Sequence, residues 1–199
     1  MLAMAPAGRV FKTIEDARAG GCREACALVL LYPHQGATHT VLTLRHAGLR
    51  DHAGQVSLPG GRIEPGEDAV AGAFREAHEE LAIEPETLDF LGMLTPLHIP
   101  PTDFCLYPVL AAARHRPAFI QQPEEVAELI EWPVHRLTDD AWRGGELRAL
   151  RGEERWIPYF RCGGHKVWGA TAMILAEVAA LWREACVHLE GPTGTEGLI

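Results

Sequence analysis

One stretch of the sequence, residues 58–83, constrains the fold more than any other, because a loop rich in glycine and proline leads directly into a helical pattern. The loop contains Pro59, Gly60, Gly61, Pro65 and Gly66. Glycines and prolines this close together predict a tight turn in which the backbone can approach a ligand. Residues 67–81 then follow helical periodicity, and Glu67 and Asp68 stand in the expected first turn, where the helix dipole favours negative charge.

The predicted helix has two different faces. An apolar stripe, expected to pack on a core, is formed by Val70, Phe74, Ala77 and Leu81. A second face carries Glu76, Glu79 and Glu80, and Gly72 leaves room on the same side. Three carboxylates this close repel one another, and a hard divalent cation such as Mg²⁺ or Mn²⁺ would reverse that repulsion. The glutamates alone would fit a solvated acidic face, but the adjoining loop favours a metal site.

The fixed positions of this stretch form the pattern G-x5-E-x7-R-E-U-x-E-E-x-G-U, where U is aliphatic. They are Gly61, Glu67, Arg75, Glu76, Ala77, Glu79, Glu80, Ala82 and Ile83. This pattern resembles the Nudix box, from which the chain departs at Ala82, where the family usually has a glycine that serves as a left-handed helix cap. The resemblance implies hydrolysis of a nucleoside diphosphate linked to another moiety, with Mg²⁺ or Mn²⁺ as cofactor.

The implied active site assigns roles to the residues of the box. Glu76 and Glu80, one helical turn apart, would bind the metal, with Glu79 as a further ligand or as the group that activates water. The carbonyl of Gly60 is a plausible backbone ligand. Catalytic support would come from an ion pair between Arg75 and a glutamate, and from Glu67, which would stabilise the loop.

The general base has alternatives outside the box. Nudix enzymes often recruit a carboxylate from a distal loop, and three acidic residues near a later strand are candidates: Glu124, Glu125 and Glu128. An exposed acidic edge is the competing interpretation for each of them.

A second pattern precedes the box and is similar to the coenzyme A pyrophosphatase subgroup, L-L-T-x-T-[S/A]-x3-R-x3-G-x3-[F/L]-P-G-G. The corresponding residues are Val41, Leu42, Thr43, Leu44, Arg45, His46, Arg50, Gly54, Leu58, Pro59, Gly60 and Gly61, with departures at Val41, Arg45 and His46. A later W-G-x-T-A sequence that begins at Trp168 also resembles this subgroup. The substrate-binding residues that we expect are Arg45, Arg50, Gly54, Leu58 and Trp168. Two solvated arginines and a core tryptophan are the competing interpretations.

Composition and net charge limit the partners and the cellular compartment that we expect. The 199 residues carry a net charge of −9, which argues against a nucleic-acid-binding surface. No apolar run is long enough to span a membrane and no signal peptide is recognisable. Five cysteines, an odd number without a C-x-x-C pair, predict a reduced, cytoplasmic protein.

The remaining pattern predicts a single domain at residues 25–188, after an extension at 1–24 that holds a short helix, and before a disordered tail at 189–199. Strands are expected at residues 24–32, 38–45, 56–58, 88–99, 104–113 and 126–132, with a hairpin at 146–161. Pro108 suggests an edge strand or a bulge. With a short helix at 137–143 and a long one at 171–188, these elements predict an α/β fold. By resemblance it is the Nudix fold, an α/β/α sandwich around a mixed β-sheet.

The sequence thus predicts metal-dependent hydrolysis of the diphosphate bond of coenzyme A or an acyl-coenzyme A, giving adenosine 3′,5′-bisphosphate and 4′-phosphopantetheine. Alternative substrates are ADP-ribose, NADH or a nucleoside triphosphate. A ligand-sensing module without turnover is a further alternative, although such modules typically lose box glutamates.

Overall fold

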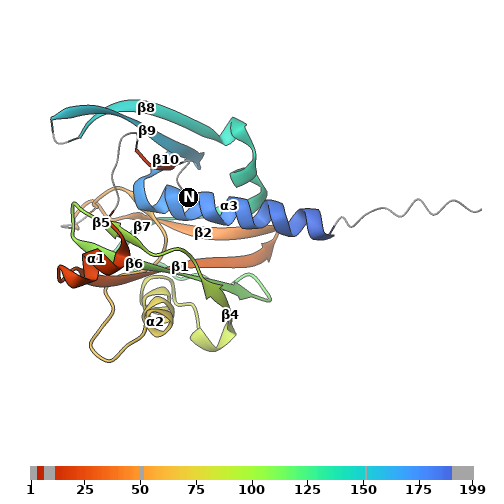
Figure 1. Cartoon of the computed structure of the whole chain (residues 1–199). Helices are drawn as coiled ribbons and strands as arrows, with labels where there is room; N and C mark the ends of the chain where they lie inside the picture. The colour runs from red at the N-terminus through yellow and green to blue at the C-terminus, as the bar shows by residue number, and fades with distance from the viewer. Residues whose placement is uncertain (1–3, 7–11, 50–51, 151, 190–199) are drawn as a thin grey trace, which may run out of the picture.

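The computed structural model describes residues 4–6, 12–49, 52–150 and 152–189 (Figure 1). Its main sheet has seven strands, and its central order is β3-β2-β1-β6-β4. Strands β1 and β6 run parallel, whereas the other neighbours are antiparallel, so the sheet is mixed. The strands of this sheet are β1 (Arg23–His34), β2 (Ala37–Arg45), β3 (Val56–Ser57), β4 (Leu88–Met93), β5 (Leu97–Ile99), β6 (Phe104–Ala113) and β7 (Val126–Pro133).

Helices cover both faces of this sheet. Helix α2 (Ala69–Leu81) lies on one face and α3 (Gly169–Leu189) on the other, as Figure 1 shows. Each interface has its own apolar cluster: Leu81 and Leu28 belong to the cluster under α2, and Met173 and Phe160 to the cluster under α3. The predicted α/β/α sandwich is therefore confirmed.

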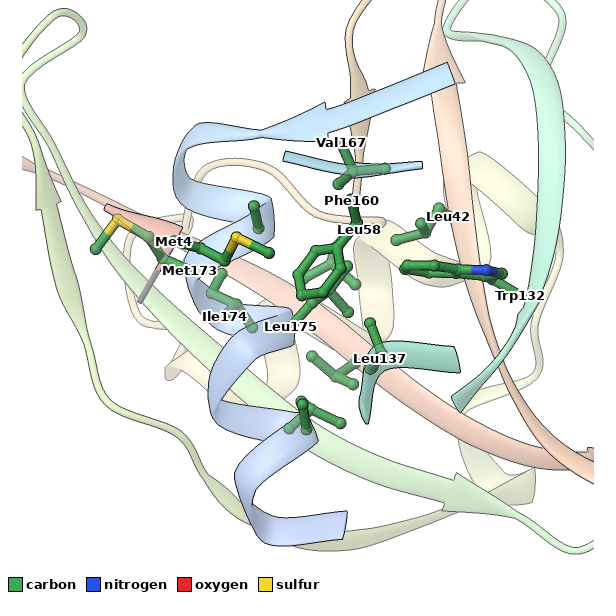
Figure 2. Packing of buried hydrophobic residues seen from close by; sticks show 14 of the residues in the cluster. Met4, Leu42, Leu58, Trp132, Leu137, Phe160, Val167, Met173, Ile174 and Leu175 are labelled. Atoms are coloured by element: carbon green, nitrogen blue, oxygen red, sulfur yellow. The ribbon is translucent and has the colours of Figure 1, made fainter. Parts of the chain in front are cut away.

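A second sheet lies on the α3 side of the molecule (Figure 1). It consists of β8 (Arg143–Leu150), β9 (Glu153–Cys162) and β10 (His165–Trp168), where the sequence predicted only a hairpin. Its Phe160 and Val167 reach the α3 core cluster shown in Figure 2. The helix predicted at residues 137–143 is wrong in type, since two 3₁₀ turns stand there, η3 (Val134–Thr138) and η4 (Asp140–Trp142).

Strand boundaries differ from the predicted ones at two prolines. Pro33 does not end β1, which continues to His34. The strand predicted at residues 88–99 is divided into β4 and β5, and both pair with β6. Pro108 lies at this division in β6, with strands on both sides of it, and its carbonyl accepts a hydrogen bond from the Leu94 N–H at 2.9 Å. A proline without an N–H is tolerated there because the partner strand is interrupted.

Helix α2 begins two residues later than predicted. Asp68 is its N-cap and accepts hydrogen bonds from the amides of Val70 and Ala71, so Glu67 lies outside the helix. The buried face is also rotated from the predicted stripe. Val70 and Phe74 are only half-buried, and the buried positions are Gly72, Ala73, Ala77, Glu80 and Leu81. Small residues allow the helix to approach the sheet closely there.

Ala82 ends α2 in the left-handed conformation, with φ of 53° and ψ of 37°. Its N–H donates to the His78 carbonyl at 2.8 Å, and the Ile83 N–H donates to the Ala77 carbonyl at 3.4 Å. The chain thus keeps the cap geometry that glycine normally supplies, with an alanine in a conformation that costs about 1 kcal/mol for an L-residue.

Only the first part of α3 is buried. Met173, Ile174, Leu175 and Val178 belong to its core face. Leu181 continues the apolar spacing of Ile174 and Val178, which predicts a core position, but it is 44% exposed. The helix extends past the sheet toward its C-terminal end (Figure 1). Leu189 ends α3, and residues 190–199 of the predicted tail lie outside the described residues.

The N-terminal extension holds the short helix that the sequence predicts within residues 1–24. Helix α1 spans Ile14–Ala19, and residues 1–3 and 7–11 lie outside the described part. Cys22, just after α1, forms a disulfide with Cys105 of β6, with 5.8 Å between their Cα atoms. The expectation that all cysteines are reduced is therefore wrong for this pair. Within the described residues, no helix has the length and apolar character needed to cross a membrane.

Candidate active site

The loop before α2 packs against β1 through two glycines. The Cys26 N–H donates to the Gly61 carbonyl at 2.9 Å, and the Leu28 N–H donates to the Pro59 carbonyl at 2.8 Å. A Cβ on Gly60 would lie 2.3 Å from the Cys26 carbonyl oxygen, and one on Gly61 would lie 2.3 Å from Glu76 Oε1. At Gly60 the clash is with backbone, so no side chain fits there, whereas a side chain at Gly61 would displace the Glu76 carboxylate. The backbone at Gly61 therefore lies directly against that carboxylate.

Arg75 connects three carboxylates. Its Nε donates to Glu67 at 2.7 Å, and its Nη1 donates to Glu76 at 3.0 Å and to Glu79 at 2.9 Å. Its Nη2 also donates to the Arg62 carbonyl at 2.9 Å, which ties the loop to the helix. The hydrogen bonds from Arg75 and from the Glu64 N–H lower the pKa of Glu67. Arg75 thus contacts Glu67, Glu76 and Glu79 together, and their supporting roles stay predictions.

Glu80 has a different environment, because it is 2% exposed and its ion pair with Arg45 is too long for a hydrogen bond. Arg45 Nη1 lies 3.9 Å from Glu80 Oε1, and within the described residues Glu80 Oε2 has no hydrogen-bond partner. Burial raises the pKa of Glu80 to about 8, with Glu76 and Glu125 raising it further and with Arg45 and the Gly60 N–H opposing the shift. Burial also raises the pKa of Glu76, against the opposing effect of Arg75.

One of the three distal carboxylates acts on this cluster through its charge. The negative charge of Glu125 raises the pKa of both Glu76 and Glu80. Glu128 instead contacts His165 at 3.0 Å, and Glu124 is exposed. The structure therefore favours Glu125 among the candidates that the sequence left open.

The segment that carries Glu125 is fixed to the end of α2. The Ile120 N–H donates to the Leu81 carbonyl at 3.0 Å, and the Gln122 N–H donates to the Glu80 carbonyl at 2.9 Å. Arg116 forms a two-point ion pair with Glu131 of β7, at 2.8 and 2.7 Å, and Glu131 also accepts from the Tyr32 hydroxyl. Sequence reasoning missed this support, because these residues lie in an aperiodic loop and on two separate strands.

The predicted substrate residues divide into three groups. Arg45, Leu58 and Trp168 line a cavity of about 1140 Å³ that also reaches Gly60 and Gly61. Gly54 instead belongs to a turn, with φ of 67° and its N–H on the Arg45 carbonyl at 3.1 Å. Arg50 lies outside the described residues.

Trp168 is half-buried at the wall of this cavity, with the Arg148 guanidinium 4.7 Å from its ring centroid. The cavity also has walls that the sequence did not predict, from Arg155 of β9 and from Ile99, Phe104 and Leu106 of β5 and β6. These residues come from segments far apart in the chain, and none of them belongs to a recognisable pattern.

The carboxylates suit a hard divalent cation in chemistry and in environment. Glu80 offers a buried oxygen without a partner, and Glu76 is held against glycine backbone. Oxygen ligands of this kind are the ones that Mg²⁺ and Mn²⁺ prefer. In the described part of the chain, no three His, Cys, Asp or Glu side chains converge as a metal-binding group. Glu76 and Glu79 both accept hydrogen bonds from Arg75.

Comparisons with known proteins agree with this geometry. A profile of the NUDIX domain matches residues 23–151. The Nudix hydrolase NudL of Pectobacterium atrosepticum is 37% identical over 162 residues, which cover 79% of this chain and 81% of that protein. NudL of Citrobacter koseri is 33% identical over 164 residues, which cover 79% of this chain and 82% of that protein.

Solved structures share the fold. A Nudix hydrolase from M. smegmatis, RenU, superposes with a TM-score of 0.53 at 20% identity, covering 87% of this chain and 90% of that one. A MutT protein from Methanosarcina mazei gives a TM-score of 0.53 at 17% identity, with 82% and 94% covered. At these identities the likeness concerns the fold alone.

Proposed function

The chain belongs to the Nudix hydrolase family, and from this premise we propose that it hydrolyses the diphosphate bond of coenzyme A or an acyl-coenzyme A. The products would be adenosine 3′,5′-bisphosphate and 4′-phosphopantetheine. Nudix hydrolases generally use a divalent cation, and Mg²⁺ or Mn²⁺ is the cofactor proposed here. A cytoplasmic location and the absence of a nucleic-acid partner stay predictions.

One observation carries the choice of substrate. Residues of the coenzyme A pattern, Arg45 and Leu58, line the same cavity as Gly60 and Gly61 of the box. The cavity is large and combines a few charged groups with apolar walls, as expected for a ligand that joins a diphosphate to an uncharged arm. Arg45 lies close enough to Glu80 to contact the substrate phosphates beside the carboxylates.

The carboxylates of α2 and of the distal loop have different proposed roles. Glu76 and Glu80 would bind the cation with Glu79, and the Gly60 carbonyl is a further proposed ligand. When bound, the cation neutralises diphosphate charge and makes water a nucleophile at neutral pH.

The other residues hold the substrate and accept the proton. Arg45 would hold the diphosphate in line with the attacking water, which is the main requirement of phosphoryl chemistry. Glu125 would accept the proton from that water, with Glu79 as the alternative base. Arg75 acts through the carboxylates that it contacts, and Glu67 acts through Arg75.

A product assay tests the proposal. Purified protein is incubated with coenzyme A, ADP-ribose, NADH and a nucleoside triphosphate, each with Mg²⁺ or Mn²⁺, and products are separated by chromatography with mass detection. We expect release of 4′-phosphopantetheine from coenzyme A well above turnover of the others. Turnover of another substrate with coenzyme A untouched would keep the Nudix chemistry and contradict the proposed substrate. Tight binding without any turnover would indicate a ligand-sensing module.

A further inference from the structure

Residues 4–6 of the N-terminal extension pack into the core next to the cavity. Met4 is 3% exposed and belongs to the same apolar cluster as Met173 and Ile174 of α3 (Figure 2). Pro6 is also buried, and it lines the cavity. Terminal residues are usually poorly ordered unless packing fixes them, so the burial of Met4 indicates that this segment is held in place.

The cavity wall that includes Pro6 is apolar and distant from the carboxylates. Its neighbours Ile99, Phe104 and Leu106 come from β5 and β6, and Ile174 comes from α3. Strand β1 separates β6 from β2, which carries Arg45, so this wall and the charged group lie about 10 Å apart. The cavity therefore extends from a charged region to an apolar one.

A phosphate would be costly to bury on this apolar wall, because it offers no hydrogen-bond donors of its own. The cations next to this wall are two exposed arginines that lie over the Phe104 ring, Arg23 at 4.3 Å and Arg62 at 5.7 Å from the ring centroid. An uncharged chain fits the wall instead, since its burial removes apolar surface from water on both partners.

We propose that Met4 and Pro6 make the N-terminal extension part of the substrate site, as one wall of an apolar subsite for the pantetheine and acyl arm. This inference rests on the proposed function, because it assumes that the diphosphate binds at the carboxylates. Pro6 would contact the arm, and Met4 would position Pro6 by packing against α3. The site then begins before residue 25, where the sequence places the start of the domain.

The subsite predicts that catalytic efficiency depends on the length of the acyl chain. Each buried methylene strengthens binding by about fourfold. The wild-type kcat/KM for hexanoyl-coenzyme A should therefore exceed that for acetyl-coenzyme A by at least about tenfold, since the two differ by four methylenes.

The test compares this chain-length ratio in wild-type protein and three variants. Pro6→Asp places a charge on the wall, and a chain lacking residues 1–6 removes it. Lys12→Ala is the matched control, because Lys12 is exposed in the same extension. We expect Pro6→Asp and the truncated chain to lower the hexanoyl-to-acetyl ratio about tenfold, with Lys12→Ala within twofold of wild type. The ratio cancels any general loss of activity, and melting temperatures check the fold.

Three outcomes would contradict the inference. A wild-type ratio near one, with both thioesters hydrolysed, would overturn the apolar subsite and leave the proposed function standing. An unchanged ratio in Pro6→Asp and in the truncated chain would place the subsite elsewhere in the cavity. Failure of wild-type protein to hydrolyse any coenzyme A derivative would overturn the proposed function, and the subsite with it.

Discussion

The acidic residues around α2 fall into two groups that the protein treats differently. Glu67, Glu76 and Glu79 share the guanidinium of Arg75, each at a hydrogen-bonding distance. Glu80 lies one turn beyond Glu76 and is almost fully buried, and its charge is favoured by Arg45 at 3.9 Å and by the Gly60 N–H. The first group is hydrogen-bonded to a cation within the fold, whereas Glu80 lies in a region where Glu76 and Glu125 add negative charge.

This difference separates carboxylates that stabilise the fold from a carboxylate that is expected to bind a ligand. A buried carboxylate without a close partner costs stability, so its retention in a folded protein favours a role with a ligand of opposite charge. A carboxylate that accepts hydrogen bonds from an arginine contributes to stability directly. Changes to the two groups should therefore have opposite effects on the free energy of unfolding.

The largest effect is expected for Glu80→Gln. This change should reduce metal-dependent turnover by about a thousandfold, because it removes a charged ligand from the centre of the site. The same variant should melt at or above the wild-type temperature, since it removes a buried charge. Glu84→Gln is the control, because Glu84 is exposed beyond the end of α2. A less stable Glu80→Gln protein with near-normal turnover would mean that Glu80 stabilises the fold and does not serve the reaction.

The next largest effect is a pH dependence of stability with a chelator present. Because burial raises the pKa of Glu80 from 4.5 to about 8, the folded state binds more protons than the unfolded state between these values. The free energy of unfolding should thus fall as pH rises from about 4.5 to 8, by on the order of 3 kcal/mol. Denaturant titrations across this range measure it. Glu80→Gln should flatten the curve, and an equally steep curve in that variant would assign the effect to another group.

Arg75→Gln tests the compensated group. Three carboxylates lose their shared partner, so stability should fall by about 2 kcal/mol, and high salt should reduce the loss by screening the repulsion that remains. Arg114→Gln is a matched control, since Arg114 is 83% exposed and its pair with Asp89 should contribute little. If both variants lost equal stability in urea titrations, the network around Arg75 would have no special structural role.

Glu125→Gln should have a smaller effect, which we expect both on kcat and on the pKa of Glu80. As the proposed base, its loss should reduce kcat by about a hundredfold at most, and the pH profile of kcat should lose its acidic limb. Removing its charge should also lower the pKa of Glu80, which nuclear magnetic resonance titration of labelled glutamate can follow. Glu128→Gln, which disturbs only the contact with His165, should change neither quantity. An unchanged pH profile in Glu125→Gln would assign the base to Glu79.

The smallest effect is expected at the end of α2. Ala82→Gly should stabilise the protein by up to about 1 kcal/mol, because glycine adopts the left-handed conformation without strain. Turnover should not change, since Ala82 contacts none of the carboxylates by side chain. This variant shows whether activity follows stability in general. A loss of turnover in Ala82→Gly would mean that the cap also sets the position of Glu80.

The box could be predicted from sequence because its chemistry requires charged residues at fixed spacing on one helix. Arg75 and Glu79 needed only the i,i+4 spacing of a helix to be brought together, and Gly60 and Gly61 needed only the loop. The distal residue Glu125 was one of three candidates, because its position depends on the Arg116–Glu131 pair and on hydrogen bonds to the end of α2. No local pattern contains that information.

Tertiary contacts decided the parts that sequence reasoning missed. Leu181 follows the helical stripe of α3 but is 44% exposed, and Pro108 is tolerated centrally because its neighbouring strand is interrupted. The pairing of Cys22 with Cys105 depends on β1 lying next to β6, across 83 residues of sequence. Spacing between cysteines cannot reveal such a contact.

That disulfide also has a consequence for the covalent structure of the chain. It closes a ring that contains β1 to β5 and α2, and thus every glutamate of the box, whereas α3 and β7 lie outside it. One proteolytic cut within the ring, for example at the turn of Gln35 and Gly36, would leave both fragments linked. Under oxidising conditions the segment that carries the carboxylates should therefore survive nicking as a single covalent unit, and only a cut outside the ring could release α3.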